Sequence, residues 1–418
     1  MKLFNPTIIQ STVCQLISAA LFHTNEPYAA DVDWQAVYEE MRAQTIQGLV
    51  MDILPELPCP EDLKKLWRSE CFQMVKNGIR LRYEQAEFLS ILEKQEIPYV
   101  VLKGTAAAMY YPNPMLRGMG DVDVYVPYMY HTELTKILTG NGYVPVSDTE
   151  DYKRHIEFKK NAVEFELHRI YAYVNGRKEK EYIDGLLEKC CSGEVKVERA
   201  EQGATAFYFP PKDINGIVLL EHIGHHLYSG LGFRQIIDWM MYVSTSLGDA
   251  EWEHFQPMAK RAGLETLAKT VTKMCVKYLG LEPKFEWCMN AEDALADEVL
   301  SFLFENGNFG RKMLYENIVV KTENRYRNSG NIFATLQATG EFNWKLYKKH
   351  HWLKPFAWLY QIGRYTRQVV TNPGVVKSFR KGTAEGKKRF DLLERLGTVN
   401  NDGRLTADDA ADRRFYQR

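Results

Sequence analysis

Residues 117–126, RGMGDVDVYV, constrain the fold of this chain more than any other segment, because they set two aspartates inside an apolar run. Three valines alternate with Asp121 and Asp123, which is the period of a half-buried β-strand. This alternation puts both carboxylates on one face of the strand, where like charges repel unless water, an arginine or a metal ion compensates them. We therefore expect a strand whose polar face belongs to a site.

The pattern of the surrounding chain predicts an α+β protein in which a small mixed sheet is flanked by helical regions. Residues 1–95 have helical periodicity, and strand and helix patterns alternate over 96–210. Helical patterns return over 211–399, and 400–418 are polar and charged. We predict an N-terminal helical region, a central α/β domain, a C-terminal helical domain and a disordered tail with these boundaries.

Composition excludes several classes of protein. The formal net charge of −1 gives no general electrostatic signal for nucleic acid or an anionic membrane. No apolar run is long enough to span a bilayer. The seven cysteines form no C-x-x-C pair, so neither a disulfide framework nor a zinc knuckle is indicated. We expect reduced thiols and a cytoplasmic protein, and the sequence leaves the oligomeric state open.

The residues that suit phosphate and metal chemistry cluster in the central segment. A short apolar strand ends in Lys103-Gly104-Thr105, where a glycine at a strand-to-helix turn lets backbone N–H groups approach a phosphate. Lys103 and Arg117 flank this turn and the aspartates, so both are candidates for pairing with phosphate oxygens. A K-G-T turn or a D-x-D pair alone is a weak signal, and the order of the parts is more specific.

A third carboxylate is expected from the segment VEFELH (163–168), which alternates like a strand. Glu164 and Glu166 lie on the same face of that strand, so the pattern leaves the choice between them open. Three carboxylates form an oxygen-rich cage that suits Mg²⁺. Mg²⁺ neutralises triphosphate oxygens, and a second ion can activate an attacking hydroxyl.

The segments LKGTAAAMYYPNPMLRGMGDVDVYV and VEFELHRIY resemble the uncharacterised nucleotidyltransferase family, which has the nucleotidyltransferase fold of the polymerase β superfamily. The motifs lie within residues 97–170. The resemblance implies that Gly104 and Thr105, in place of the usual glycine-serine pair, hold the nucleotide phosphates. It implies that Asp121 and Asp123 bind metal, with Glu166 as the third carboxylate that also helps to deprotonate the acceptor.

The expected function is therefore Mg²⁺-dependent transfer of a nucleoside monophosphate from an NTP such as ATP to an acceptor hydroxyl, with release of pyrophosphate. Two Mg²⁺ ions and the NTP are the expected ligands, and the acceptor is an unidentified small molecule or protein. The alternatives are a catalytically degenerate protein that binds a nucleotide or a partner, and a toxin-like enzyme that modifies protein or tRNA.

Histidines near these motifs have weaker signals. His168 follows Glu166 at strand spacing and is either a site residue or a hydrogen-bonded histidine at a strand end. The segment EHIGHH (221–226) predicts a helix that lines the cleft, although it lacks the H-E-x-x-H spacing of a hydrolytic zinc site. Arg234 and Asp238, one helical turn apart, are expected to form an ion pair.

Overall fold

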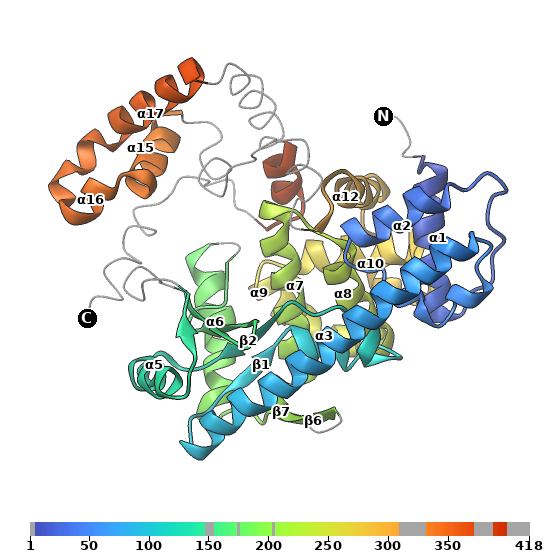
Figure 1. The fold of residues 1–418 in the computed structure, drawn as a ribbon, viewed down its shortest axis with the longest axis horizontal. Helices are drawn as coiled ribbons and strands as arrows, with labels where there is room; N and C mark the ends of the chain where they lie inside the picture. Colours follow the sequence, from blue (N-terminus) through green and yellow to red (C-terminus); the bar gives the residue numbers. More distant parts are fainter. Residues whose placement is uncertain are drawn as a thin grey trace.

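A computed structural model of the chain describes residues 5–146, 154–173, 176–202, 205–308, 332–371 and 388–398. It consists of two β-sheets embedded among many helices, so the prediction of an α+β protein with a small mixed sheet is confirmed (Figure 1). The helices before the central sheet are α1 (Ile8–Phe22), α2 (Trp34–Ala43) and α3 (Glu61–Lys94).

The larger sheet has five strands in the order β1-β2-β5-β4-β3. The strand β2 runs antiparallel to β1 and parallel to β5, and the remaining pairs are antiparallel. The elements that build this part are β1 (Val100–Leu102), α4 (Gly104–Ala108), β2 (Asp121–Tyr125), α5 (His131–Gly140), β3 (Val144–Pro145), β4 (His155–Lys160), β5 (Val163–His168) and α6 (Arg177–Ser192).

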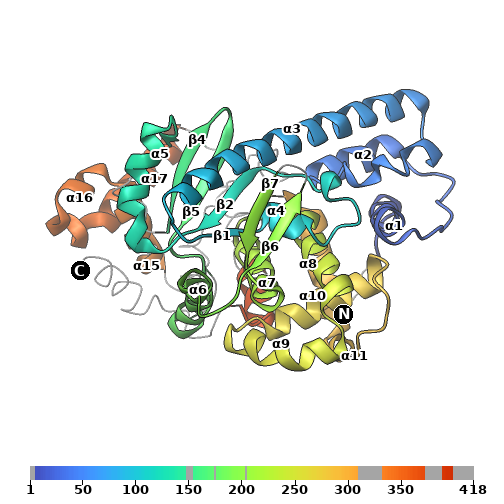
Figure 2. The same ribbon diagram turned by 90° about the horizontal axis from the view of Figure 1, so that it is seen from below.

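One face of this sheet is apolar and packs on α3 and α5. The alternate residues of β2 and β5 that point to this face, such as Val124 and Phe165, are fully buried. Phe165 stacks on Phe88 of α3, with 4.9 Å between ring centroids, and meets the edge of Tyr143. Figure 2 shows α3 running along this side of the strands, with α6 and α7 (Lys212–Ser229) on the other side. The opposite face is therefore available for polar groups.

The predicted strands that end at Lys103, that carry the two aspartates and that span 163–168 all form, and the last of them pairs with β4 as a hairpin. The β4–β5 hairpin turns through Asn161 and Ala162, both with positive φ, which is the geometry of a two-residue type I′ turn. The sequence analysis did not predict the two-stranded sheet of β6 (Glu198–Gln202) and β7 (Thr205–Phe209), whose β7 packs beside α3 and β1.

The helices before and after the central sheet share one hydrophobic core. This core joins buried residues of α1 and α2 to residues of later helices, for example Ile17 to Met274 and Leu303. The buried amide of Gln44 connects them directly, donating to the carbonyl of Leu303 at 2.9 Å and accepting from the N–H of Phe233 at 3.3 Å. The later helices are α8 (Phe233–Ser246), α9 (Asp249–Arg261), α10 (Glu265–Tyr278), α11 (Glu286–Met289) and α12 (Asp293–Asn306).

The predicted boundaries near residues 95 and 210 stay predictions, although α3 contributes its second half to the core of the sheet. Residues 400–418, predicted to be disordered, lie outside the described residues. The aromatic segment 352–370 forms a 3-10 turn (His351–Phe356) that contains Pro355, followed by α17 (Ala357–Thr371). That helix packs on α15 (Ile332–Asn343), next to the short α16 (Lys345–Lys349), in a group that stands apart in Figure 1.

No helix in the described part of the chain combines the length and the apolar character that crossing a membrane requires.

Phe165 tests the apolar face of the sheet. Replacing Phe165 with alanine removes a fully buried ring between α3 and β5 and should lower the free energy of unfolding by about 3–5 kcal/mol. Chemical denaturation measures this loss. Tyr83→Ala, on the exposed side of α3, should change stability by less than about 0.5 kcal/mol. Equal losses for the two variants would contradict the described core.

Candidate metal and nucleotide site

The polar face of the sheet gathers side chains from three neighbouring strands. In β2 and β5, which run parallel, Asp121 lies opposite Glu164, Asp123 opposite Glu166, and Tyr125 opposite His168. In β4, His155 lies opposite His168 and Glu157 opposite Glu166. Because paired residues point to the same face of a sheet, the register itself collects carboxylates and imidazoles in one place.

Three carboxylates come close enough to share one cation. Oxygen atoms of Asp121, Asp123 and Glu166 all lie within 4.8 Å of one another. Glu164, the alternative third carboxylate, is instead 58% exposed and forms an ion pair of 2.6 Å with Lys159. The structure thus brings Glu166, and not Glu164, to the two aspartates.

Two positive groups from the protein already neutralise this cluster. The ammonium of Lys103 lies 2.8 Å from Oδ1 of Asp123 and faces the ring of Tyr171. The Nε2 atom of His168 lies 2.8 Å from the same oxygen and 3.3 Å from Oε2 of Glu166. The sequence analysis did not predict that Lys103 and His168 neutralise the aspartates, although it named both as candidate site residues.

Lys103 reaches the cluster from an unusual backbone conformation. Its φ of 51° and ψ of −137° lie in a region that residues with a side chain rarely adopt, and Gly104 follows with a φ of 33°. Two successive positive φ values turn the chain sharply between β1 and α4. This turn brings the lysine ammonium to Asp123 on β2, and the ion pair between them offsets part of the strain.

The electrostatics of the cluster differ between its members. Burial, followed by the charge of Asp123, raises the pKa of Asp121 to about 6. Burial works against the charged form of Glu166, but the hydrogen bond and charge of His168 hold its pKa below the usual range. For His168 and Lys103 burial also opposes the charged form, yet the neighbouring carboxylates raise the pKa of both. The cluster therefore favours bound cations.

The remaining predicted site residues have other partners. The hydroxyl of Thr105 donates to Oε1 of Gln85 on α3 at 2.9 Å and is buried, so the structure does not bring this hydroxyl to the carboxylates. The guanidinium of Arg117 forms a buried, two-pronged ion pair with Asp238, at 2.8 and 2.6 Å. Asp238 was expected to pair with Arg234 on its own helix, but both of its oxygens accept from Arg117.

Helix α7 lies on the side of the sheet opposite α3 (Figure 2), and its predicted role in lining a cleft stays a prediction. His222 and His226 are buried with their Nε2 atoms 2.9 Å apart, and burial lowers the pKa of both far below the usual range. The rings of His225 and Tyr173 are in contact at a tilt of 31°, with 3.9 Å between their centroids. Among the residues that the structure describes, two groups of side chains could hold a metal ion, and no histidine of α7 belongs to either group.

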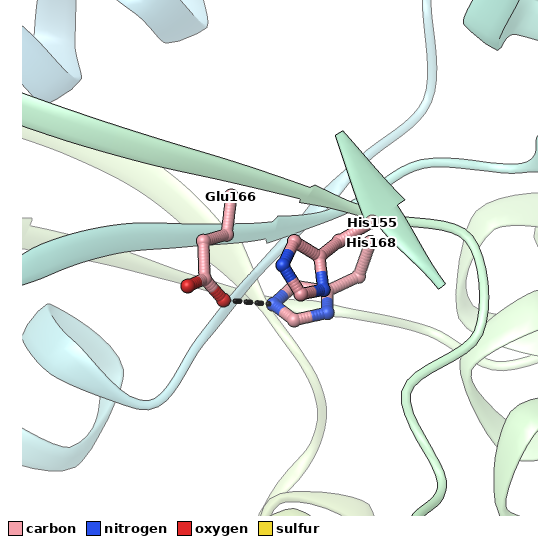
Figure 3. Close-up of side chains that lie close together, drawn as sticks. All are labelled: His155, Glu166 and His168. Atoms are coloured by element: carbon pink, nitrogen blue, oxygen red, sulfur yellow. Dashed lines mark ion pairs between the residues drawn. The ribbon is translucent and has the colours of Figure 1, made fainter. Parts of the chain in front are cut away.

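His155 is the site residue that the sequence analysis missed. Figure 3 shows it beside His168 and Glu166, and ligating atoms of these three residues also lie within 4.8 Å of one another. The register explains why it was missed, because a turn at Asn161-Ala162 places residue 155 opposite residue 168, whereas a turn one residue earlier would place it opposite residue 166. Without that register, His155 looks like any histidine at the start of a strand.

Comparison with known proteins gives a result consistent with this site. The family model described as "Uncharacterised nucleotidyltransferase" matches residues 30–280, which include the whole larger sheet together with α7 and α8. No match was found among curated proteins. The matched range extends well beyond the motif segment 97–170 on both sides.

Asp121→Asn should stabilise the metal-free protein in a pH-dependent way. Because burial raises the folded pKa of Asp121 to about 6, above its ordinary value of 3.8, the stability that the protonated carboxyl allows at low pH is lost as pH rises through 6. The melting temperature of the variant should exceed that of the wild type by a few degrees at pH 7.5 and hardly at pH 4. Mg²⁺ should raise the melting temperature of the wild type and have little effect on the variant. A difference that grows toward low pH would contradict this assignment.

Lys103→Met tests whether the buried ammonium of Lys103 neutralises the carboxylate cluster. Removing one partner of a buried ion pair leaves repelling carboxylates, so the free energy of unfolding should fall by roughly 3–5 kcal/mol without metal. Saturating Mg²⁺ should recover part of that loss. The matched control is Lys159→Met, whose ion pair with Glu164 is exposed and whose loss should be under about 1 kcal/mol. A Lys103→Met variant as stable as the control would show that the ammonium does not neutralise the cluster.

Proposed function

The chain belongs to the uncharacterised nucleotidyltransferase family, and on that premise we propose that it transfers a nucleoside monophosphate from an NTP to an acceptor hydroxyl. The observation that carries this proposal is the convergence of Asp121, Asp123 and Glu166 on one face of the sheet. Three carboxylates in this arrangement suit a divalent cation held next to a polyphosphate. The family match and the carboxylate cluster rest on independent observations.

The donor set fits magnesium. All three side chains offer only oxygen, their ligand atoms lie within 4.8 Å of one another, and Mg²⁺ prefers oxygen ligands in a small octahedral shell. We propose that Asp121, Asp123 and Glu166 hold up to two Mg²⁺ ions together with the NTP. When bound, such ions neutralise phosphate oxygens and make an acceptor hydroxyl more acidic.

The proposed role of the protein residues is to hold the reactants and to move one proton. The acceptor oxygen forms a bond to the α-phosphorus while the bond from that phosphorus to the bridging oxygen breaks, and pyrophosphate leaves with the electron pair. The hydroxyl proton passes to a carboxylate of Glu166. Lys103 would bind the triphosphate if cations took its place at Asp123, and the backbone at Gly104 and Thr105 would support the phosphates.

Arg117 is better suited to support the site than to contact the nucleotide. Its two-pronged contact with Asp238, together with the hydroxyl of Tyr111 on the same carboxylate, ties the segment before β2 to helix α8. A buried pair with a second donor is costly to open. We therefore leave Arg117 out of the proposed phosphate ligands and propose that it positions the start of the strand that bears both aspartates.

Asp123→Asn and Glu166→Gln test the reaction. Each removes a metal-binding charge and should lower pyrophosphate release from labelled NTPs, measured with Mg²⁺ and a broad set of acceptors, by at least about 100-fold. The matched control is Glu164→Gln, on the same face of the same strand but paired with Lys159, which should stay within about threefold of the wild type.

The outcomes separate the proposed reaction from its alternative. Turnover that survives both substitutions would refute the metal-site assignment. Saturable nucleotide binding without turnover, across all NTPs and acceptors, would favour a degenerate protein that only binds nucleotides. Equal losses for Glu164→Gln and Glu166→Gln would show that the third carboxylate was assigned wrongly.

A further inference from the structure

A second set of ligating atoms lies beside the three carboxylates and has a different chemistry. It consists of His155 on β4 with Glu166 and His168 on β5, and one ligating atom from each lies within 4.8 Å of the others (Figure 3). The antiparallel register places the two histidines directly opposite each other, with 5.2 Å between ring centroids. Both sets share Glu166.

Nitrogen donors change which cation such a set prefers. Mg²⁺ selects oxygen ligands, whereas imidazole nitrogen suits Zn²⁺, Co²⁺ and related transition-metal ions. Two histidines and one carboxylate supply three ligands and leave further positions for water or substrate, which is the composition of many catalytic and regulatory metal sites. The two neighbouring sets therefore differ in the class of ion that they favour.

The surroundings of the two histidines also resemble a built metal site. Oε1 of Glu157 lies 3.2 Å from Nε2 of His155, and a carboxylate on one ring nitrogen commonly orients a histidine that binds metal through the other. Nε2 of His168 lies 2.8 Å from Oδ1 of Asp123 and 3.3 Å from Oε2 of Glu166, so a metal ion bound through this nitrogen would replace the proton that neutralises both carboxylates. Both imidazoles lie on the polar face of the sheet.

We propose that His155, Glu166 and His168 bind a divalent transition-metal ion, with Zn²⁺ or Co²⁺ preferred over Mg²⁺. Because Glu166 belongs to both sets, its carboxylate bridges this ion and a cation held by the two aspartates. Binding at the histidine set requires neither Asp121 nor a nucleotide. The inference therefore stands on the geometry of the sheet and does not rest on the proposed reaction.

Co²⁺ is a suitable probe, since its visible absorption reports nitrogen ligation. The metal-free full-length protein is titrated with Co²⁺, and bound metal is measured by equilibrium dialysis and by the absorption bands. The wild type should bind Co²⁺ with visible bands in excess Mg²⁺. His155→Ala should weaken this binding by more than about tenfold and reduce the bands, because it removes a ligand rather than an orienting partner.

Two variants provide matched comparisons. Asp121→Asn removes a ligand of the carboxylate set only and should keep the Co²⁺ affinity and bands of the wild type. His254→Ala removes an exposed histidine on α9 and should change neither. Should His155→Ala fail to fold, as judged by circular dichroism, His155→Gln keeps a polar side chain of similar length and replaces it.

The proposal is wrong if the His155 variant retains the affinity and spectrum of the wild type. It is also wrong if Asp121→Asn abolishes the bands while His155→Ala does not, because the ion would then lie among the carboxylates. These readouts use no nucleotide and no turnover, so they can fail while the pyrophosphate assay succeeds, and the reverse.

Discussion

The parallel pairing of β2 with β5 is the constraint on which the rest of this structure depends. It aligns Asp123 with Glu166 and sets Tyr125 beside His168, although about forty residues of chain separate the two strands. A shift of one residue would turn the polar side chains of one strand into the apolar core against α3. The buried aromatic contacts of Phe165 therefore stabilise the register, and this register brings the carboxylates together.

The fold must also compensate for the charges that this register collects. Lys103 and His168 both contact Asp123, one from a strained turn after β1 and one from the neighbouring strand. None of the described residues forms an ion pair with Asp121, and burial raises the pKa of its carboxyl to about 6. Ionisation of Asp121 near neutral pH therefore lowers the free energy of unfolding unless a cation is bound, which links stability to ligand binding.

Helices remote in sequence support the site from outside the sheet. Asp238 of α8 holds Arg117 before β2, and Gln44 ties the N-terminal helices to α8 and α12. These buried polar contacts join parts of the chain that the pattern of residues had separated into regions. The family match also covers helices on both sides of the motifs. A site of this kind depends on the whole helical frame, since its carboxylate strand is anchored there.

Much of the fold was predictable from the local pattern. Alternation revealed β2 and β5, and helical periodicity revealed the flanking helices, because these signals depend on neighbouring residues alone. The short β6–β7 sheet was missed, since its strands are stable only where β7 packs beside α3 and β1.

The sequence by itself determined that Asp121 and Asp123 share a face, that a glycine turn precedes them, and that an acidic strand follows. Only the tertiary structure decided which glutamate joins the aspartates, which cations neutralise them and which residue Asp238 holds. It also decided that His155 meets His168. The physical reason is that spacing within a strand specifies the face of a side chain, whereas register between strands specifies its neighbours. Register depends on packing across the whole sheet.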